Sequence, residues 1–243
     1  MYNFIDIFCG IGSMTKAFER TGAFKCVGGI DFDRNMLSLY KHLFFYTPIV
    51  EGDILKNDGV RRFILSAEHD VIVAGMADLN EEVFFKVLDI LSEDLPKAFV
   101  FELSTAPIHK SLCKTLKNFC EKNDYIFVGF DDGIDNITLN LFDFGVPEQC
   151  ERIYCVCIRK DCCHCDDDLF LQLRKEHDFE CYKYDGYNPD ENIKQRRGLD
   201  WGFSGKIGFL IGTPEKEKEN IVESSSPLPV VASVALDLMT WLK

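Results

Sequence analysis

The chain has 243 residues, of which 47% are hydrophobic and 28% charged, enough for one well-buried domain with a small appendage. Its 27 basic and 40 acidic residues give a net charge of −13, which opposes tight contact with a phosphate backbone and argues against an autonomous DNA-binding protein. No signal-peptide pattern or apolar run of membrane-spanning length is present, so we expect a soluble intracellular protein of the nucleus or cytoplasm.

The chain contains eleven cysteines, a number that would suggest disulfides in a short secreted protein. Here the number is odd and no secretory signal precedes the first apolar run. We therefore expect reduced thiols.

The first predicted element is a strand over Phe4–Phe8, which ends at two glycines spaced by one residue, Gly10 and Gly12. Apolar residues at helical spacing follow from Ser13. The glycines allow a sharp turn and close approach of a ligand to the backbone, and a helix starting there directs N–H groups at that ligand. A plain strand-to-helix turn of any α/β domain is the alternative.

A second predicted strand, Cys26–Ile30, ends on an acid–aromatic–acid sequence about 20 residues after the glycines. Nucleotide-binding units place an acid at this spacing to bind ribose hydroxyls, a role that Asp31 fits. Phe32 beside it could stack on an adenine ring. A third apolar run, Pro48–Val50, precedes Gly52-Asp53-Ile54.

These three segments resemble the first three motifs of the C5-cytosine DNA methyltransferases, in the family's order and spacing. The resemblance rests on the segments Asp6–Gly12, Asp31–Asp33 and Gly52–Ile54. It implies S-adenosylmethionine (SAM), or its demethylated product S-adenosylhomocysteine (SAH), as cofactor. The implied cofactor-binding residues in these motifs are Phe8, Gly10, Gly12, Asp31, Phe32, Asp53 and Ile54.

A fourth predicted strand, Asp70–Gly75, leads into Met76-Ala77-Asp78-Leu79-Asn80. The resemblance places Asp78 where the family has its nucleophilic cysteine. The family's reaction needs a thiolate that adds to C6 of cytosine, and a carboxylate is far less nucleophilic toward such a carbon. We therefore expect no intact catalytic nucleophile.

The short length of the segment Met76–Asn80 also argues against catalysis. The family follows its cysteine with a mobile loop of roughly twenty residues that closes over the extruded base. Here Glu82–Leu91 predicts a helix directly after Asn80. We interpret Met76–Asn80 as a short connection rather than a catalytic loop.

A fifth predicted strand, Lys97–Phe101, ends at Glu102, which stands at the place of the family's Glu-Asn-Val motif. The resemblance implies that Glu102 is a relic of the acid that contacts cytosine N3. A solvated acid or a helix cap is the alternative. A helix over Lys110–Cys120 and a strand over Tyr125–Phe130 follow.

Gly145-Val146-Pro147 and the residues after it resemble the family's Gly-Val-Pro-Gln-x-Arg-x-Arg segment. Glu148 takes the place of the glutamine and Cys150 that of the first arginine, so that Arg152 alone remains as a relic. The loss of a neutral donor and of one guanidinium predicts a weaker hold on a flipped nucleotide and its phosphates.

Cysteines crowd the next segment, together with one histidine: Cys155, Cys157, Cys162, Cys163, His164 and Cys165. Zinc sites pair two separated Cys-x-x-Cys or Cys/His elements, a spacing that this run lacks. Buried thiols on a hydrophobic strand are the interpretation we favour over a metal site, and we expect no metal.

Residues 161–222 stand where the family has its target-recognition domain. This region is too short and too acidic to form a complete domain that recognises a DNA sequence. The closing segment from Ser224 resembles the family's last motif, with Ser225 and Ser226 at the positions that touch SAM. A helix over Val230–Leu242 completes the chain.

We therefore predict an α/β fold: a doubly wound, mostly parallel, Rossmann-like SAM-methyltransferase sheet. The predicted units are a core at 1–160, a reduced target-recognition-like insertion at 161–222 and a C-terminal helix at 223–243. The predicted function is a SAM-binding, catalytically inactive family member that acts as a regulatory or binding partner in nucleic-acid methylation. Its expected partner is a protein such as an active methyltransferase, with weak or absent binding to DNA alone and none to membranes. The alternative is an active SAM-dependent methyltransferase on DNA or RNA, using another mechanism or residues from a partner.

Overall fold

The computed structural model describes residues 1–76, 80–130, 133–141, 151–164 and 228–242. Several sequence predictions lie outside these residues, namely those for Asp78, Glu148, Cys150, Cys165, Ser225, Ser226 and most of the insertion at 161–222. In the described part of the chain, no helix combines the length and apolar character needed to cross a bilayer.

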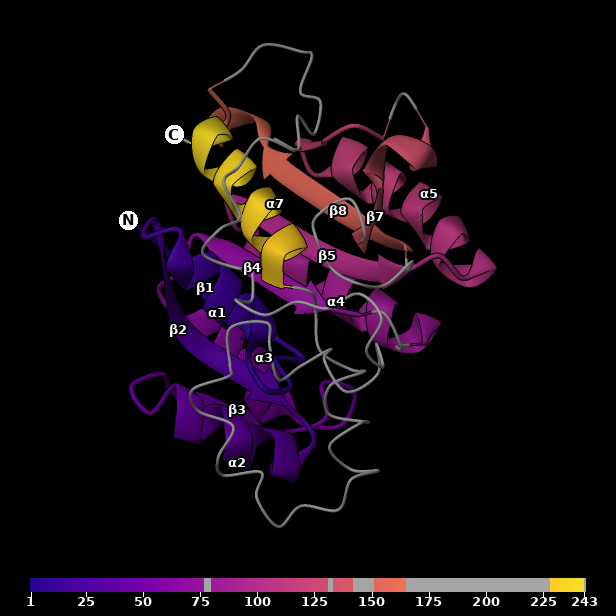
Figure 1. Ribbon diagram of the computed structural model, residues 1–243. Coiled ribbons are helices and arrows are strands. Elements are labelled where there is room, and N and C mark those ends of the chain that lie inside the picture. The colour runs from indigo at the N-terminus through magenta and orange to yellow at the C-terminus, as the bar shows by residue number, and fades with distance from the viewer. Residues whose placement is uncertain (77–79, 131–132, 142–150, 165–227, 243) are drawn as a thin grey trace, which may run out of the picture.

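The described strands form one 8-stranded sheet in the order β3-β2-β1-β4-β5-β8-β6, with β7 paired to β8 (Figure 1). Strands β1 to β5 run parallel, and β8 runs antiparallel to β5, β6 and β7. This confirms the predicted doubly wound, mostly parallel sheet. The strands are β1 (Tyr2–Ile7), β2 (Phe24–Asp31), β3 (Ile49–Glu51), β4 (Val71–Gly75), β5 (Ala98–Ser104), β6 (Tyr125–Phe127), β7 (Thr138–Asn140) and β8 (Glu151–Arg159).

Helices cover both faces of the sheet, α1, α2 and α7 on one face and α3, α4 and α5 on the other (Figure 1). The α-helices are α1 (Ser13–Arg20), α2 (Arg34–Leu43), α3 (Asp58–Ser66), α4 (Glu81–Asp94), α5 (Pro107–Lys122) and α7 (Leu228–Trp241), with 3-10 turns at η1 (Ile134–Ile137) and η3 (Lys160–Cys162). The sequence analysis did not predict α2 and α3. Each begins at an N-cap whose side chain accepts backbone N–H bonds, Asp33 for α2 and Asn57 for α3.

The alternation of side chains along each strand produces two separate cores. On β4, Val71 and Val73 join the core beneath α1, α2 and α7, whereas Ile72 and Ala74 join the core beneath α3, α4 and α5. All four are fully buried. Strands buried on both faces read as nearly continuous apolar runs, which is why the sequence showed them so clearly.

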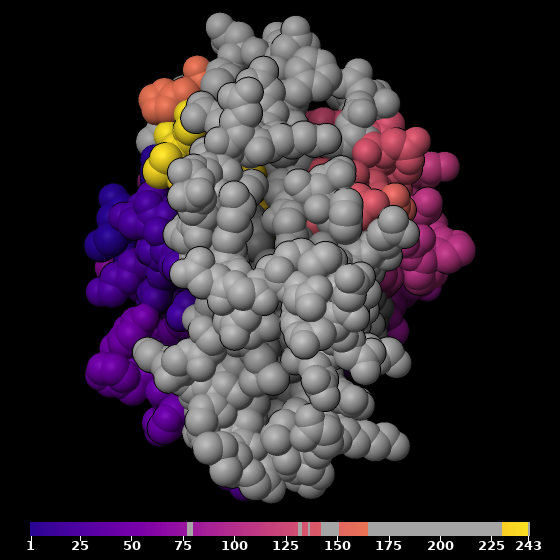
Figure 2. Space-filling model, viewed as in Figure 1, coloured from indigo at the N-terminus to yellow at the C-terminus, as the bar shows by residue number. Residues whose placement is uncertain are grey.

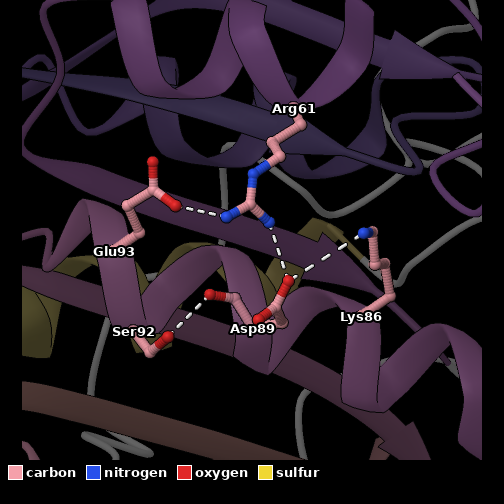
Figure 3. Close-up of polar contacts among 5 residues, drawn as sticks. All are labelled: Arg61, Lys86, Asp89, Ser92 and Glu93. Atoms are coloured by element: carbon pink, nitrogen blue, oxygen red, sulfur yellow. Dashed lines mark hydrogen bonds and ion pairs between the residues drawn. The ribbon is translucent and has the colours of Figure 1, made fainter. Parts of the chain in front are cut away.

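An ion-pair cluster on the surface ties α3 to α4 (Figure 3). The Arg61 guanidinium lies between the carboxylates of Asp89, 2.7 Å away, and Glu93. These acids are four residues apart on α4 and therefore share one helix face. Lys86 approaches Asp89 more loosely, at 3.9 Å. The cluster is exposed, so salt weakens it.

The predicted end of the strand that begins at Tyr125 was wrong. The strand expected to continue to Phe130 ends at Phe127. Gly129 adopts φ +73, and the Phe130 N–H donates to the Phe127 carbonyl, which turns the chain out of the sheet. A glycine in the left-handed region is a common strand terminator, and its position inside an apolar run concealed it.

Candidate cofactor site and catalytic edge

The glycine turn lies where the sheet order reverses, because β1 has β2 on one side and β4 on the other. In an open α/β sheet, the carboxyl ends of the strands at this point form the ligand crevice. Three residues of the turn have left-handed backbone: Phe8 at φ +59, Gly10 at φ +51 and Gly12 at φ +89. A bulky residue at positive φ is strained, and such strain concentrates at ligand-binding sites.

The two glycines of the turn have different environments. A Cβ placed on Gly10 would meet no described heavy atom within 4 Å, so this side of the turn is open to a ligand. A Cβ on Gly12 would lie 2.3 Å from the Phe44 ring and 2.9 Å from Tyr40. Gly10 therefore leaves space in front of the turn, whereas Gly12 lets two aromatic rings support it from behind.

Asp31 joins the end of β2 to this turn. Its carboxylate accepts the Gly10 N–H and the Asp33 N–H, each at 2.9 Å. Burial raises the pKa of this carboxyl, while the N–H donors of Asp33, Gly10 and Phe32 act in the opposite direction. Phe32 is 62% exposed beside it, which leaves its ring available for stacking. The structure thus brings Gly10, Asp31 and Phe32 together, as the ribose-and-adenine prediction requires.

A buried polar network beneath α1 was missed by the sequence analysis. Asp6 accepts hydrogen bonds from the Thr15 N–H at 3.0 Å and the Thr15 hydroxyl at 2.7 Å. That hydroxyl lies 2.9 Å from the Tyr40 hydroxyl, which is 3.5 Å from the Cys26 thiol. Burial raises the pKa of Asp6 to about 7. Polar residues on an apolar strand and an adjacent helix were the signal that could have revealed this network.

Two buried oxygens near the turn, Asp6 Oδ1 and Ser13 Oγ, have no hydrogen-bond partner among the described residues. Buried polar atoms are normally paired, so both suit a polar ligand or a bound water. Gly12, the N-cap residue of α1, has no side chain to cap the first N–H groups of the helix, of which the Thr15 N–H is bonded to Asp6. Together with the open side of Gly10, these groups fit a nucleoside carrying an amino-acid moiety, as SAM does.

The third motif lies beside the end of β2, because the Gly52 N–H donates to the Asp31 carbonyl at 2.9 Å. Ile54 is buried. The Asp53 carboxylate accepts the Leu55 N–H at 2.9 Å and pairs with Lys56 at 2.8 Å. Lys56 holds the pKa of Asp53 below its ordinary value.

Glu102 lies on β5 directly opposite Tyr154 of β8. It is 3% exposed, the Tyr154 hydroxyl donates to it at 3.3 Å, and Arg152 lies 3.6 Å from its other oxygen. The alternative that Glu102 is a solvated acid or a helix cap is therefore wrong. Arg152 pairs with Ser104, the last residue of β5. It therefore lies at the edge of the sheet where the parallel strands end.

Two residues of this edge were not identified from the sequence. Tyr154 is the first, since its role depends on the register between β5 and β8. The second is His109 in α5, whose Nδ1 lies 2.7 Å from the Ser104 hydroxyl. This buried histidine joins the end of β5 to the first turn of α5.

The connection after β4, which the sequence analysis interpreted as too short for the family's catalytic loop, is short in the structure. β4 ends at Gly75 and α4 begins at Glu81, so only residues 76–80 join them. Asn80 is the N-cap of α4 and accepts the Val83 N–H at 3.1 Å. The Met76 N–H donates to the Glu102 carbonyl at 2.8 Å. Both ends of the connection are thereby fixed.

The cysteine-rich segment forms thiol pairs in the described part of the chain. Cys155 and Cys157 are buried on β8 and face two cysteines of α5. The Cys113 and Cys155 sulfurs are 3.9 Å apart, and those of Cys120 and Cys157 are 3.5 Å apart. Within the described ranges, no group of three or more histidine, cysteine or acidic side chains could hold a metal ion. Cys162 and Cys163 are also buried thiols.

The sheet topology, the glycine turn and the acid at the end of β2 define a Rossmann-like methyltransferase fold. A family model for the C-5 cytosine-specific DNA methylases matches residues 2–197, and the chain belongs to that family. SAM is the cofactor of this family.

Curated relatives agree with this assignment. The type II methyltransferase M.HhaI of Haemophilus parahaemolyticus is 29% identical over 175 residues, covering 65% of this chain and 49% of the relative. M1.ScrFI of Lactococcus lactis subsp. cremoris is 31% identical over 173 residues, covering 64% of this chain and 41% of the relative. The chain thus aligns with about half the length of these relatives.

Solved structures share the fold. The Dnmt2 methyltransferase of S. pombe superposes with a TM-score of 0.67 at 13% identity, covering 98% of each chain. A putative DNA modification methyltransferase encoded within an E. coli prophage gives a TM-score of 0.55 at 20% identity, covering 66% of this chain and 47% of that protein.

Proposed function

We propose that this chain binds SAM or SAH at the glycine turn but does not methylate C5 of cytosine, and that it acts as a binding or regulatory subunit in nucleic-acid methylation. The observation that carries the proposal is the connection between β4 and α4. It consists of residues 76–80, and the sequence resemblance assigns Asp78 to the position of the family's cysteine. A thiolate and a loop long enough to close on a base are both required for the family's reaction.

The cofactor side supports retained binding. Phe8, Gly10 and Gly12 form an open, strained turn, Asp31 and Phe32 stand beside it, and Asp6 and Ser13 contribute unpaired oxygens. In a methyltransferase, SAM supplies an electrophilic methyl group. In this chain, the residues around the turn would bind and orient the nucleoside and its amino-acid group. Ser225 and Ser226 remain proposed contacts from the resemblance alone.

The partner proposal depends on charge. A chain with a net charge of −13 repels phosphates at long range, and opposite charge steers protein association. We therefore propose weak or absent binding to DNA alone and association with another protein, such as an active methyltransferase of the same family.

One observation favours the alternative of an active enzyme. Glu102 is buried and held by Tyr154 and Arg152 at the same edge of the sheet as the glycine turn. A positioned acid of this kind could serve direct methyl transfer to a nitrogen or oxygen nucleophile, which needs no cysteine.

One measurement tests the cofactor proposal, and a second separates the two functions. Isothermal titration calorimetry with SAH should show binding that weakens about tenfold or more in Asp31→Ala, because a buried charged acceptor at the turn is lost. Asp33→Ala is the matched control, since this neighbouring acid caps α2 instead. The absence of SAH binding at millimolar ligand would refute the cofactor proposal. Incubation with radiolabelled SAM and DNA, RNA or cell extract should label no macromolecule, and a labelled product would favour the enzyme.

A further inference from the structure

Two buried carboxylates lie at the glycine turn, and neither has a cation as a partner in the described chain. Asp6 on β1 is 1% exposed, and Asp31 at the end of β2 is 6% exposed. Neither forms an ion pair with a described lysine, arginine or histidine. In Figure 2, the indigo N-terminal elements, to which β1 and α1 belong, form the left margin of the visible face. Buried charges are normally paired, so a site that keeps two acids without a counter-charge favours a cationic ligand.

Asp6 lies beneath the first turn of α1, the helix end that follows the glycine turn. One of its oxygens accepts the N–H and the hydroxyl of Thr15, the third residue of α1. Its other oxygen, Oδ1, has no partner in the described chain. Gly10, whose open side is where a ligand can approach, follows four residues later. A charge on Asp6 therefore acts on a ligand at this turn through a buried environment that salt screens poorly.

The ionisable groups next to Asp6 do not neutralise it. Burial raises the pKa of Asp6 to about 7, although the bonds from Thr15 lower it. Burial also raises the pKa of the Cys26 thiol and of the Tyr40 hydroxyl, so both stay neutral near pH 7. The same holds for the Cys9 thiol in the turn. Asp31 can only add negative charge to this cluster.

The elements packed on this side of β1 supply no cation to the cluster either. On β4, the residue paired with Asp6 is Val73, and α7 has the buried Asp237 as its one ionisable residue. The charged side chains of α1 line a pocket at the surface, and those of α2 are exposed. These are Lys16, Glu19 and Arg20 of α1 and Arg34, Lys41 and His42 of α2.

SAM and SAH differ in the charge that this cluster would meet. The sulfur of SAM carries the methyl group and a positive charge, whereas the thioether sulfur of SAH is neutral. The ammonium and carboxylate groups are common to both. Two unit charges about 10 Å apart, at the effective dielectric constant of a protein interior, change an equilibrium constant about tenfold. The charge of Asp6 therefore favours SAM far more than SAH.

We propose that Asp6 determines the preference of this site between SAM and SAH: the ionised carboxylate favours the sulfonium cation, and the protonated carboxyl group removes that preference. The inference rests on the proposed cofactor binding and adds which form of the cofactor the site holds. By linkage, SAM binding near neutral pH releases a proton from Asp6. The preference for SAM is thus present above neutral pH and is lost as the pH falls.

Isothermal titration calorimetry of the full chain with SAM and with SAH, from pH 6 to pH 8, tests the proposal. The ratio of the SAH dissociation constant to the SAM dissociation constant should rise about fivefold over this range. At pH 7, the dependence of the heat on the buffer should show more proton release with SAM than with SAH. The amino groups of the free ligands also titrate here, so each ratio is compared with that of Asp6→Asn, which lacks the Asp6 contribution.

A second variant separates charge from structure. Thr15→Val keeps the shape of the side chain but removes a donor to the ionised carboxylate, so the SAM preference should appear at a higher pH than in the wild type. A purely structural Asp6 predicts no such shift. The matched control is Asp33→Asn, which retains a side chain able to cap α2 and should leave the pH dependence unchanged.

Three results are decisive. The proposal is overturned if Asp6→Asn keeps the pH dependence of the wild type, or if the wild-type ratio is the same at pH 6 and pH 8. In either case, binding of both ligands leaves the cofactor proposal intact. Absence of binding by both ligands at millimolar concentration refutes the cofactor proposal and this one with it.

Discussion

The unequal surroundings of Gly10 and Gly12 predict that adding one methyl group has different consequences for stability and for ligand binding at the two positions. Both residues have positive φ, so an alanine costs about 1–2 kcal/mol of backbone strain at either. At Gly10 nothing described lies within 4 Å of the new methyl. At Gly12 the methyl would lie 2.3 Å from Phe44 and 2.9 Å from Tyr40. Overpacking there adds about 1–3 kcal/mol, for a total near 2–5 kcal/mol.

The variants should rank differently in SAH affinity than in stability. In Gly10→Ala the methyl group occupies the open side of the turn, so we expect SAH affinity to fall at least about tenfold while the protein stays folded. Gly22→Ala is the matched control, because Gly22 also has positive φ and open space but lies at the end of α1. It should lose similar stability and bind SAH normally.

Urea denaturation at 25 °C measures the free energy of unfolding, and calorimetry measures SAH affinity for each variant that remains folded. The reasoning is refuted if Gly10→Ala binds SAH as well as Gly22→Ala does. It is refuted equally if Gly12→Ala is no less stable than Gly10→Ala.

Two further predictions concern catalysis and pH. Asp78→Cys alone should give no 5-methylcytosine above background by mass spectrometry of treated DNA, since residues 76–80 cannot form the closing loop; any product would contradict the loop argument. His69 Nδ1 and Nε2 lie 2.8 and 2.9 Å from two acceptors, the Ala67 carbonyl and the Asp94 carboxylate. Burial acts to lower the pKa of His69, but Asp94 raises it above the ordinary value. The stabilisation is thus complete below the unfolded-state pKa of about 6.5 and is lost as pH rises through the folded-state value. Urea midpoints from pH 6 to 8 should fall more in wild type than in His69→Gln, and parallel curves would count against a protonated His69.

The sequence was sufficient for the parallel sheet because β1, β2, β4 and β5 are apolar runs that end at polar or glycine residues. It also placed Gly10, Asp31 and Phe32 correctly at one edge. Helices α2 and α3 were missed, and at the start of α2 the N-cap residue was given another role. Asp33 was assigned to an acid–aromatic–acid motif, and its carboxylate in fact accepts the N–H groups of Asn35 and Met36.

Features that depend on distant pairing could not be predicted. The partners of Glu102 required the register between β5 and β8, which places Tyr154 opposite it. The thiol pair of Cys120 and Cys157 likewise arises only when α5 packs on β8. Gly12 was correctly identified as part of a turn, but its contact with Phe44 depends on how the end of α2 packs behind that turn.

The position of β8 has a consequence for the order in which the chain can fold during synthesis. β8 lies between β5 and β6, although it follows β6 in sequence. Until residues 151–159 leave the ribosome, β5 presents an open hydrogen-bonding edge and β6 has no neighbouring strand. The face beneath α1 must also wait for α7, the last described helix, to cover it. A nascent chain therefore exposes both an unpaired edge and an apolar face until β8 and α7 have been synthesised, which makes products truncated before these elements prone to aggregation.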